Sequence, residues 1–233
     1  MSEDWEARFE QFIAGTFDDE AGGSAAPDPA HDLAHIRRVV ASARLLAAGE
    51  GADPAVVLPA AWLHDCVRLP KDSPDRSTAS QLAARRAGEF LSEAGYSPDL
   101  IPAIEHAIAA HSFSAGIAPQ TLEARVVQDA DRLDALGAIG IARTLMLGGV
   151  MNMPLYDPDE PLPISRTADD GKNVIDHFYV KLLTLTDRMH TAAARREGRR
   201  RTRLMEQFLT ELEREISAKT FAAEAVPLRP GET

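Results

Sequence analysis

The chain has 233 residues, of which 45% are hydrophobic, 26% charged and 6% aromatic, and its formal net charge is −11. This length and composition predict one ordinary globular domain and exclude a disordered chain. The acidic balance excludes non-specific binding to nucleic acid or to anionic membranes, because both depend on a positive surface, so an anionic substrate needs a local positive site such as a metal ion.

The single cysteine, Cys66, excludes an intrachain disulfide and favours a reducing compartment. The N-terminus is acidic and lacks the basic and then apolar pattern of a signal peptide. No run approaches the ~18 apolar residues of a membrane span. We therefore expect a cytoplasmic protein that binds no membrane.

Helical periodicity recurs along almost the whole length, and no segment alternates as a half-buried strand does, which predicts an all-α fold. In chain order, helices are expected over residues 5–13, 32–49, 54–65, 77–95 and 98–111, from 120 through the segment VVQDADRLDALG, around the glycines of 137–149, over 174–189, and on to about 216. A loop rich in Gly, Ala, Pro and Asp is expected over 18–30.

Two helix starts carry capping residues: Asp32, and Asp53 followed by Pro54. The helix after Asp53 is apolar on every face, which predicts burial at the centre of the bundle. It ends at His64 and Asp65, where further core residues would be expected. Two groups that bind metals and exchange protons therefore follow a buried helix.

A long loop is expected over residues 151–171, where four prolines occur. Loops of this length without structure of their own are uncommon in compact domains and often act as lids over a site. We expect residues 1–217 to form a single helical domain and residues 218–233 to be a flexible C-terminal tail.

Four segments place His and Asp in largely apolar helical settings. They are HDLAHI with His31 and His35, LHDC with His64 and Asp65, the pair His106 and His111, and QDADRLD with Asp129, Asp131 and Asp134. Unpaired buried charges are costly, so such a set predicts a shared partner, and a divalent cation fits it. Imidazole and carboxylate without thiolate favour Mn²⁺, Fe²⁺, Ni²⁺, Co²⁺ or Mg²⁺ in an open octahedral shell over structural zinc.

The order His35, then His64 and Asp65, then Asp131 resembles the H…HD…D pattern of the HD-domain metal-dependent phosphohydrolases. Over about residues 31–190, the segments HDLAHI, WLHDCVRLPKDSPDRS, HAIAAHSFSAGIAPQTLEARVVQDADRLDALGAIGIAR and DHFYVKLL are similar to small stand-alone bacterial HD hydrolases, some of which are nucleoside triphosphate pyrophosphohydrolases. The resemblance implies an HD-type helical bundle around one divalent metal ion, with these four residues as its ligands.

In families with this pattern the second histidine of HDxxH is the ligand, which implies that His31 caps a helix or supports the site. Four protein ligands leave two positions of an octahedral shell for water or phosphate oxygens, as in an open catalytic site. A metal there offsets phosphate charge and lowers the pKa of water. Hydrolysis of a phosphoester or phosphoanhydride bond is the reaction that these two effects serve best.

His106 and His111 are five positions apart, which separates them by about 140° on one helix. We expect both to border a pocket and to bind phosphate or donate a proton to the leaving group, rather than to ligate one ion together. A core or surface role is the alternative for each, and in some HD proteins histidines here bind a second metal. Asp134 lies on the helical face of Asp131 and is expected to hydrogen-bond a ligand histidine.

The loop segment PKDSPDRS carries three further candidates. The resemblance implies that Lys71 and Arg76 hold a substrate phosphate and that Asp72 orients the attacking water. A solvated surface is the alternative reading for all three.

Five other polar residues are expected to serve the fold. Asp129 is less well placed for the site than its neighbours. Arg132 is expected to pair with a carboxylate rather than to contact substrate, and Cys66 to be a small buried residue. Core or surface roles are expected for His177 and His190.

The run RREGRRRTR, residues 195–203, contains six arginines. It opens a helix that continues LMEQFLTELEREI, so a charged outward face is favoured over nucleic-acid binding. Contact with a second copy of the chain, as in a homodimer, or with an acidic partner is the open alternative.

The favoured function is a divalent-metal phosphohydrolase that converts a nucleoside triphosphate to a monophosphate and pyrophosphate. A nucleotide phosphomonoesterase or phosphodiesterase, or a hydrolase of a guanine tetraphosphate-type alarmone, would use the same ligands. A non-catalytic nucleotide sensor would bind without turnover. A purely structural helical protein would bind no stoichiometric metal.

Overall fold

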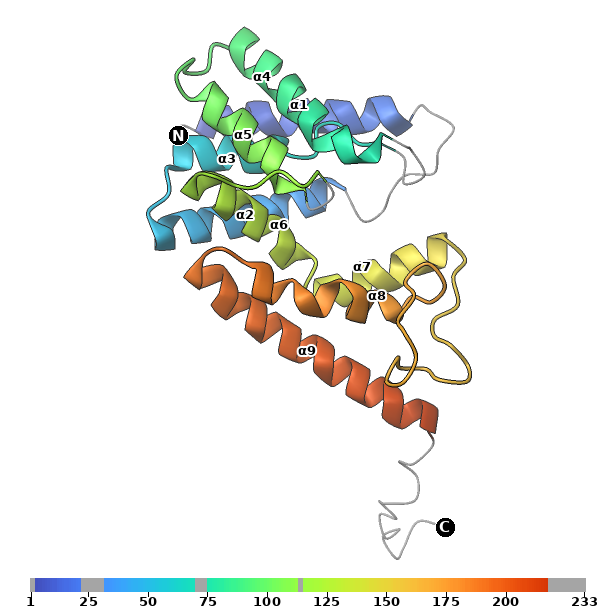
Figure 1. The fold of residues 1–233 in the computed structure, drawn as a ribbon. Helices are drawn as coiled ribbons and strands as arrows, with labels where there is room; N and C mark the ends of the chain where they lie inside the picture. Colours follow the sequence, from blue (N-terminus) through green and yellow to red (C-terminus); the bar gives the residue numbers. More distant parts are fainter. Residues whose placement is uncertain (1–2, 22–31, 70–74, 113–114, 218–233) are drawn as a thin grey trace, which may run out of the picture.

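The computed structural model describes residues 3–21, 32–69, 75–112 and 115–217, so the tail predicted over 218–233 lies outside the described residues. Within these ranges the chain is helical and has no strand, which confirms the all-α prediction. The α-helices are α1 (Glu3–Ala21), α2 (Leu33–Glu50), α3 (Pro54–Leu63), α4 (Ala79–Glu93), α5 (Ile101–His111), α6 (Leu122–Asp134), α7 (Gly137–Val150), α8 (Asp176–Val180) and α9 (Ala192–Ser217). Figure 1 shows α1 to α6 gathered in one bundle, with α7, α8 and α9 along one side of it.

The central helix is α3, which packs against α1, α2, α5 and α6 (Figure 1). Asp53 caps it, since Asp53 Oδ1 accepts a hydrogen bond from Ala55 N at 2.8 Å, and Pro54 opens the first turn. Residues 56–63 are all buried, as a helix that is apolar on every face requires. The chain therefore leaves α3 inside the bundle, and His64 is fully buried.

Helices α2 and α6 pack against each other, and each begins at a side-chain cap. Asp32 Oδ1 accepts from His35 N at 2.7 Å, and Thr121 Oγ1 accepts from Ala124 N at 3.1 Å. Each helix turns one apolar face to the core, and that face also carries a buried polar residue, His35 on α2 and Asp134 on α6. The packing of α2 on α6 therefore brings two ionisable groups together.

The long helix α9 covers α7, α6 and α2. Its buried side includes Met205 and Leu209, and the opposite side is charged. In the arginine run, Glu197 accepts from Arg200 at 2.7 Å and from Arg201 at 2.8 Å. These ion pairs fit the predicted charged outward face.

The prediction of one helix over 174–189 is wrong, because this segment forms α8 and two short 3-10 helices, η2 (Leu182–Thr184) and η3 (Thr186–Arg188). Its first residues pair with the preceding loop instead of forming a helical turn, and Val174 N donates to Pro154 O at 3.0 Å. Lys181 then leaves the helical region, with φ −129° and ψ −60°. Apolar periodicity alone could not reveal either break.

Helix α1 is longer than predicted. It continues to Ala21, whereas the sequence predicts a loop from residue 18. The four residues Asp18, Asp19, Glu20 and Ala21 include no glycine or proline that would end a helix.

The long loop over 151–171 is held against α8 by a buried carboxylate. Asp176 is fully buried and accepts from Arg166 Nη1 at 2.5 Å, from Arg166 Nη2 at 2.6 Å and from Asp169 N at 2.7 Å. Earlier in the loop, Glu160 Oε2 accepts a hydrogen bond from Ser165 Oγ at 2.7 Å. The role of the loop as a lid stays a prediction.

Among the described residues, no helix taken singly has the length and hydropathy of a membrane span. Helices α6 and α7 reach the length and hydropathy of a span only when they are taken together, and the chain bends by 65° between them.

Candidate metal centre

The four residues proposed from the sequence as metal ligands converge in the bundle. His35 comes from α2, His64 and Asp65 from the end of α3, and Asp131 from α6. His35 Nε2 lies 3.7 Å from Asp65 Oδ2 and 3.6 Å from Asp131 Oδ1. His64 Nε2 lies 3.6 Å and 4.0 Å from the same two oxygens. These separations are longer than hydrogen bonds and leave space for a shared ion between the side chains.

His64 is oriented by the helix that it ends. Its Nδ1 donates to Ala61 O at 2.9 Å, so its Nε2 is directed at Asp65 and Asp131. Burial lowers the pKa of His64 to about 4, so the ring is neutral near pH 7 and Nε2 carries a lone pair. Within the part of the chain that the structure describes, this buried Nε2 has no hydrogen-bond partner. A buried acceptor of this kind fits a metal ligand.

His35 is oriented by a carboxylate from α6. Its Nδ1 lies 2.7 Å from Asp134 Oδ2, an arrangement in which Nδ1–H donates and Nε2 points to the centre. Asp134 therefore contacts the ligand histidine His35 and does not face the centre itself. A carboxylate in this position fixes the tautomer of a ligand histidine and raises its basicity.

Two arginines that sequence reasoning missed hold Asp134. Arg38 donates through Nε to Oδ1 at 2.7 Å and through Nη2 to Oδ2 at 3.0 Å, and Arg143 Nη1 donates to Oδ2 at 2.7 Å. Burial alone would raise the pKa of Asp134, but hydrogen bonds from His35 and Arg38 and the charge of Arg143 outweigh it and hold that pKa well below its usual range. The available signal for Arg38 was its position three residues after His35 on one helix.

His111 joins the cluster from the C-terminal end of α5. Its Nδ1 donates to Ile108 O at 2.7 Å, and its Nε2 lies 3.5 Å from Asp65 Oδ1. Burial alone lowers the pKa of His111, but contact with Asp65 and the charge of Asp131 outweigh it and raise the pKa above its ordinary value. The His64 and His111 rings meet edge to face, with centroids 4.8 Å apart.

His106 is not brought to the cluster. Its Nε2 accepts from Gln120 N at 3.0 Å, which fixes the turn before α6. His31, Lys71 and Asp72 lie outside the described residues. Arg76 belongs to the 3-10 helix η1 (Arg76–Thr78), but its side chain is also outside the described part.

Four residues expected to serve the fold have protein partners. Asp129 is fully buried and accepts from His190 N at 3.0 Å and from Thr191 N at 2.8 Å. Cys66 is buried beside Ala83 O, and burial raises the pKa of its thiol to about 12. His177 Nδ1 lies 2.8 Å from Asp170 Oδ2. Arg132 donates to a main-chain carbonyl, Arg188 O, and not to the carboxylate predicted from the sequence.

The donor atoms form two overlapping sets. His35, His64 and Asp131 make one, and His64, Asp65 and His111 make the other; within each set the atoms lie within 4.8 Å of one another. The donors are imidazole nitrogens and carboxylate oxygens without sulfur, a combination that suits Mn²⁺, Fe²⁺, Co²⁺ or Ni²⁺. This arrangement fits a divalent ion with positions left for water or phosphate oxygen.

Comparison with known proteins gives the following matches. The sequence profile described as HD domain matches residues 32–136, the interval that holds all of these donors. The uncharacterized protein YpgQ of Bacillus subtilis (strain 168) is 33% identical over 190 residues, which cover 80% of this chain and 84% of YpgQ. An HD-superfamily hydrolase from Bacillus thuringiensis has a crystal structure that aligns with a TM-score of 0.68 at 33% identity, over 92% of this chain and 99% of that one. The crystal structure of Bacillus subtilis YpgQ in complex with ADP aligns with a TM-score of 0.67 at 31% identity, over 90% of this chain and 95% of that one.

Proposed function

We propose, from the premise that this chain belongs to the HD-domain superfamily of metal-dependent phosphohydrolases, that its substrate is a nucleoside triphosphate and its products are a nucleoside monophosphate and pyrophosphate. The observation that carries the proposal is the cluster in which two buried imidazole nitrogens face two partly exposed carboxylates across distances of 3.6–4.0 Å. That YpgQ has been crystallised with ADP supports a nucleotide as the ligand class.

His35, His64, Asp65 and Asp131 are the proposed ligands, and Mn²⁺ is the ion to test first. A divalent ion bound there supplies positive charge to the phosphate and lowers the pKa of water. The chain contributes the positions of the donors: Asp134 fixes His35, and Ala61 O fixes His64. Asp65 and Asp131 keep partial exposure, so a phosphate can approach from their side.

In the proposed reaction, the oxygen of water bonds to the α-phosphorus, and the bond from that phosphorus to the bridging oxygen breaks. The electron pair of that bond leaves with pyrophosphate, and the attacking water releases a proton to solvent. His111 is the proposed proton donor to the leaving oxygen, since its Nε2 faces the cluster at 3.5 Å from Asp65. The roles given to Asp72, Lys71 and Arg76 rest on the resemblance alone and remain proposals. The proposed location is the cytoplasm.

The test is product analysis. Protein stripped with EDTA is incubated with a panel of nucleoside mono-, di- and triphosphates, with Mn²⁺ or Mg²⁺ added back. We expect monophosphate plus pyrophosphate from triphosphates, only with metal. The variant Asp65→Ala should lose this activity, and Asp99→Ala, which removes an exposed carboxylate, should keep it.

The alternatives give different outcomes when a nucleotide phosphodiester and guanine tetraphosphate-type compounds are added to this panel, and cleavage of the diester identifies a phosphodiesterase. Orthophosphate from monophosphates identifies a phosphomonoesterase, and pyrophosphate from guanine tetraphosphate-type compounds identifies an alarmone hydrolase. Metal-dependent nucleotide binding without any product overturns the enzymatic proposal in favour of a sensor.

A further inference from the structure

Beside the metal cluster, α6 contacts the segment that leads into α9. Arg132 directly follows the proposed ligand Asp131, and Gln128 lies one turn earlier. Gln128 Nε2 donates to Ala110 O at 2.6 Å, the carbonyl of the residue before His111, and Gln128 Oε1 lies 2.6 Å from His190 Nε2. One buried amide therefore connects the end of α5 to His190, and Arg132 lies close enough to Asp131 for the charge of that carboxylate to oppose the lowering of the Arg132 pKa by burial.

Arg132 has donor capacity that the described part of the chain does not use. Its Nη1 donates to Arg188 O at 2.5 Å and lies 3.4 Å from His190 Nε2. Since His190 Nε2 shares its proton with Gln128 Oε1 at the shorter distance of 2.6 Å, it is a poor acceptor for Arg132. Arg132 Nε is buried and has no hydrogen-bond partner in the described part of the chain. A buried donor without an acceptor is rare and calls for an oxygen acceptor such as a water or a ligand.

Two further arginines surround His190, and neither is neutralised. Arg125 Nε donates to Pro119 O at 3.3 Å, and Arg195 Nη1 donates to Met189 O at 2.7 Å. Both partners are main-chain carbonyls, and no carboxylate pairs with either arginine among the residues described. Burial lowers the pKa of His190; the charge of Asp129 opposes this shift, and the charges of Arg132, Arg125 and Arg195 add to it.

The nearby carboxylate, Asp129, is already engaged. Its oxygens accept from His190 N, Thr191 N and Thr191 Oγ1 at 2.8–3.1 Å, so they hold the start of α9 rather than a guanidinium. Three arginines, Arg132, Arg125 and Arg195, therefore share this region with the two carboxylates of Asp129 and Asp131, which leaves an excess of positive charge in a chain whose net charge is −11. Guanidinium groups bind phosphate oxygens through charge-assisted hydrogen bonds.

We propose that Arg132, with the charges of Arg125 and Arg195 behind it, forms an anion subsite for the phosphates beyond the bond that is cleaved. The proposal rests on the proposed function, because it assigns this subsite to the β- and γ-phosphates of a triphosphate whose α-phosphate is at the metal cluster. The subsite binds the leaving pyrophosphate and favours substrates with a polyphosphate chain over monophosphates.

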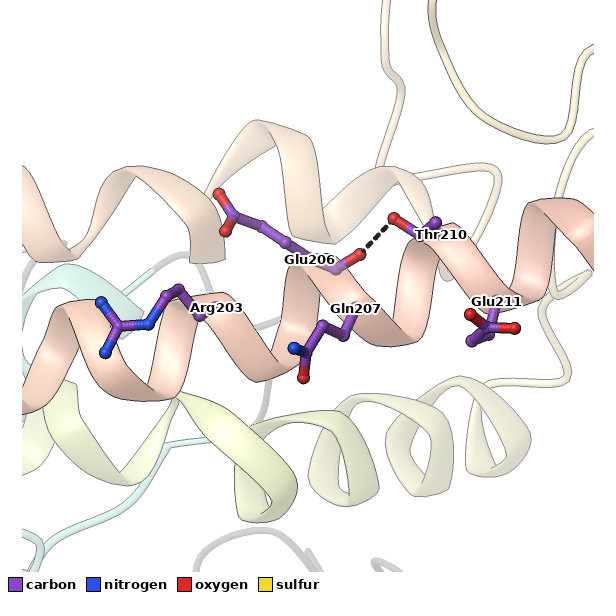
Figure 2. A pocket seen from close by; sticks show the side chains of 5 residues that line it. All are labelled: Arg203, Glu206, Gln207, Thr210 and Glu211. Carbon is purple, nitrogen blue, oxygen red and sulfur yellow. Dashed lines mark hydrogen bonds between the residues drawn. The ribbon is translucent and has the colours of Figure 1, made fainter.

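The direct test is calorimetric titration of inorganic pyrophosphate into Mn²⁺-loaded protein. Losing one charge-assisted contact corresponds to about a tenfold loss of affinity. We therefore expect Arg132→Gln to weaken pyrophosphate binding about tenfold or more and to leave binding of a nucleoside monophosphate within about twofold. The control is Arg203→Gln, which removes an equal charge from α9. Arg203 is exposed, and Figure 2 shows it near Glu206 and Gln207 on that helix.

Kinetics separates this proposal from the function on which it rests. With a nucleoside triphosphate, we expect Arg132→Gln to raise KM about tenfold with little change in kcat. If the parent protein hydrolyses no triphosphate, the proposed function fails, and the pyrophosphate titration still decides the subsite. Equal pyrophosphate affinity in the parent and Arg132→Gln proteins overturns the subsite.

A second variant covers the case in which Arg132→Gln does not fold, since Arg132 also holds Arg188 O. Arg125 is exposed, so Arg125→Gln should fold normally. We expect it to weaken pyrophosphate binding about two- to threefold at low salt and to lose this effect at high salt, as a screened charge does. Unchanged affinity at low salt contradicts the proposal.

Discussion

The three buried histidines of the candidate centre are oriented in the same way. Each uses Nδ1 as the donor of a hydrogen bond that fixes the ring, to Asp134 for His35, to Ala61 O for His64 and to Ile108 O for His111. In each case Nε2 is left to face the carboxylates. For His64 and His111 the acceptor is the carbonyl three residues earlier, so the end of a helix is sufficient to set the direction of the ring.

The carboxylate behind His35 should control metal affinity. We expect Asp134→Asn to weaken Mn²⁺ binding about 10- to 100-fold, because the neutral amide neither orients the imidazole with the same strength nor raises its basicity. Titration of Mn²⁺ into stripped protein, followed by electron paramagnetic resonance, measures this directly. Asp99→Asn is the matched control, and equal affinity in all three proteins would rule out a positioning role for Asp134.

His106 and His111 should behave differently although they share one helix. We expect His111→Gln to reduce kcat about 100-fold or more, the usual effect of losing a general acid. We expect His106→Gln to keep kcat/KM within about twofold, since its ring contacts Gln120 N and not the cluster. Steady-state rates for the two variants check this pair, and a large loss in His106→Gln alone would reverse the assignment.

At the scale of elements, α6 shows what sequence can and cannot predict. The resemblance to the H…HD…D pattern proposed Asp131 as a metal ligand, and the spacing of three residues then predicted that Asp134 hydrogen-bonds a ligand histidine. The role of Asp129 depends on His190 and Thr191, which follow it by 61 and 62 positions. No local pattern reveals contacts so far apart in the sequence. Arg143 was missed for the same reason, because its contact with Asp134 requires the bend between α6 and α7.

The loop over 151–171 should depend on Asp176. Burial alone raises the pKa of Asp176, but the hydrogen bonds from Arg166 and Asp169 N outweigh it, so the folded-state pKa lies below its usual value. A carboxyl with a lowered folded pKa stabilises the fold above the unfolded pKa of about 3.9, and this contribution is lost as the pH falls through the folded value.

The substitution Asp176→Asn should therefore lower the urea midpoint at pH 7 and reduce its fall on acidification. Urea titrations between pH 7 and pH 3, read by circular dichroism, compare the variant with the parent. Asp187→Asn, which changes an exposed carboxylate in η3, is the control. A parallel decline in the variant and the parent would show that Asp176 has no such role.

At the scale of the whole molecule, the centre unites helices from distant parts of the chain, so metal binding and folding should be linked. An ion at 100 times its Kd stabilises the folded state by about 2.7 kcal/mol. For a domain of this size that raises Tm by roughly 5–10 °C. Thermal unfolding of stripped protein with and without Mn²⁺ measures the shift, which Asp99→Ala should keep and Asp65→Ala should largely lose.

The fold class could be predicted because apolar periodicity carries it, and the convergence of His35, His64, Asp65 and Asp131 because their order resembles the H…HD…D pattern of a known family. The contacts of α7, α8 and α9 could not be predicted in the same detail. The pairing of Arg166 with Asp176 and the contact of Arg132 with Arg188 O depend on how α7 to α9 are placed against the bundle, and that placement leaves no local pattern in the sequence.

The contact between His35 and Asp134 joins positions 99 apart, and Arg143 lies 108 positions from His35. A ribosome adding about 5–20 residues per second makes His35 some 5–20 seconds before Asp134 exists. During that interval the nascent chain has imidazoles and Asp65 but lacks the aspartates of α6. A site that includes Asp131, with His35 held by Asp134, can therefore form only after synthesis has passed α6.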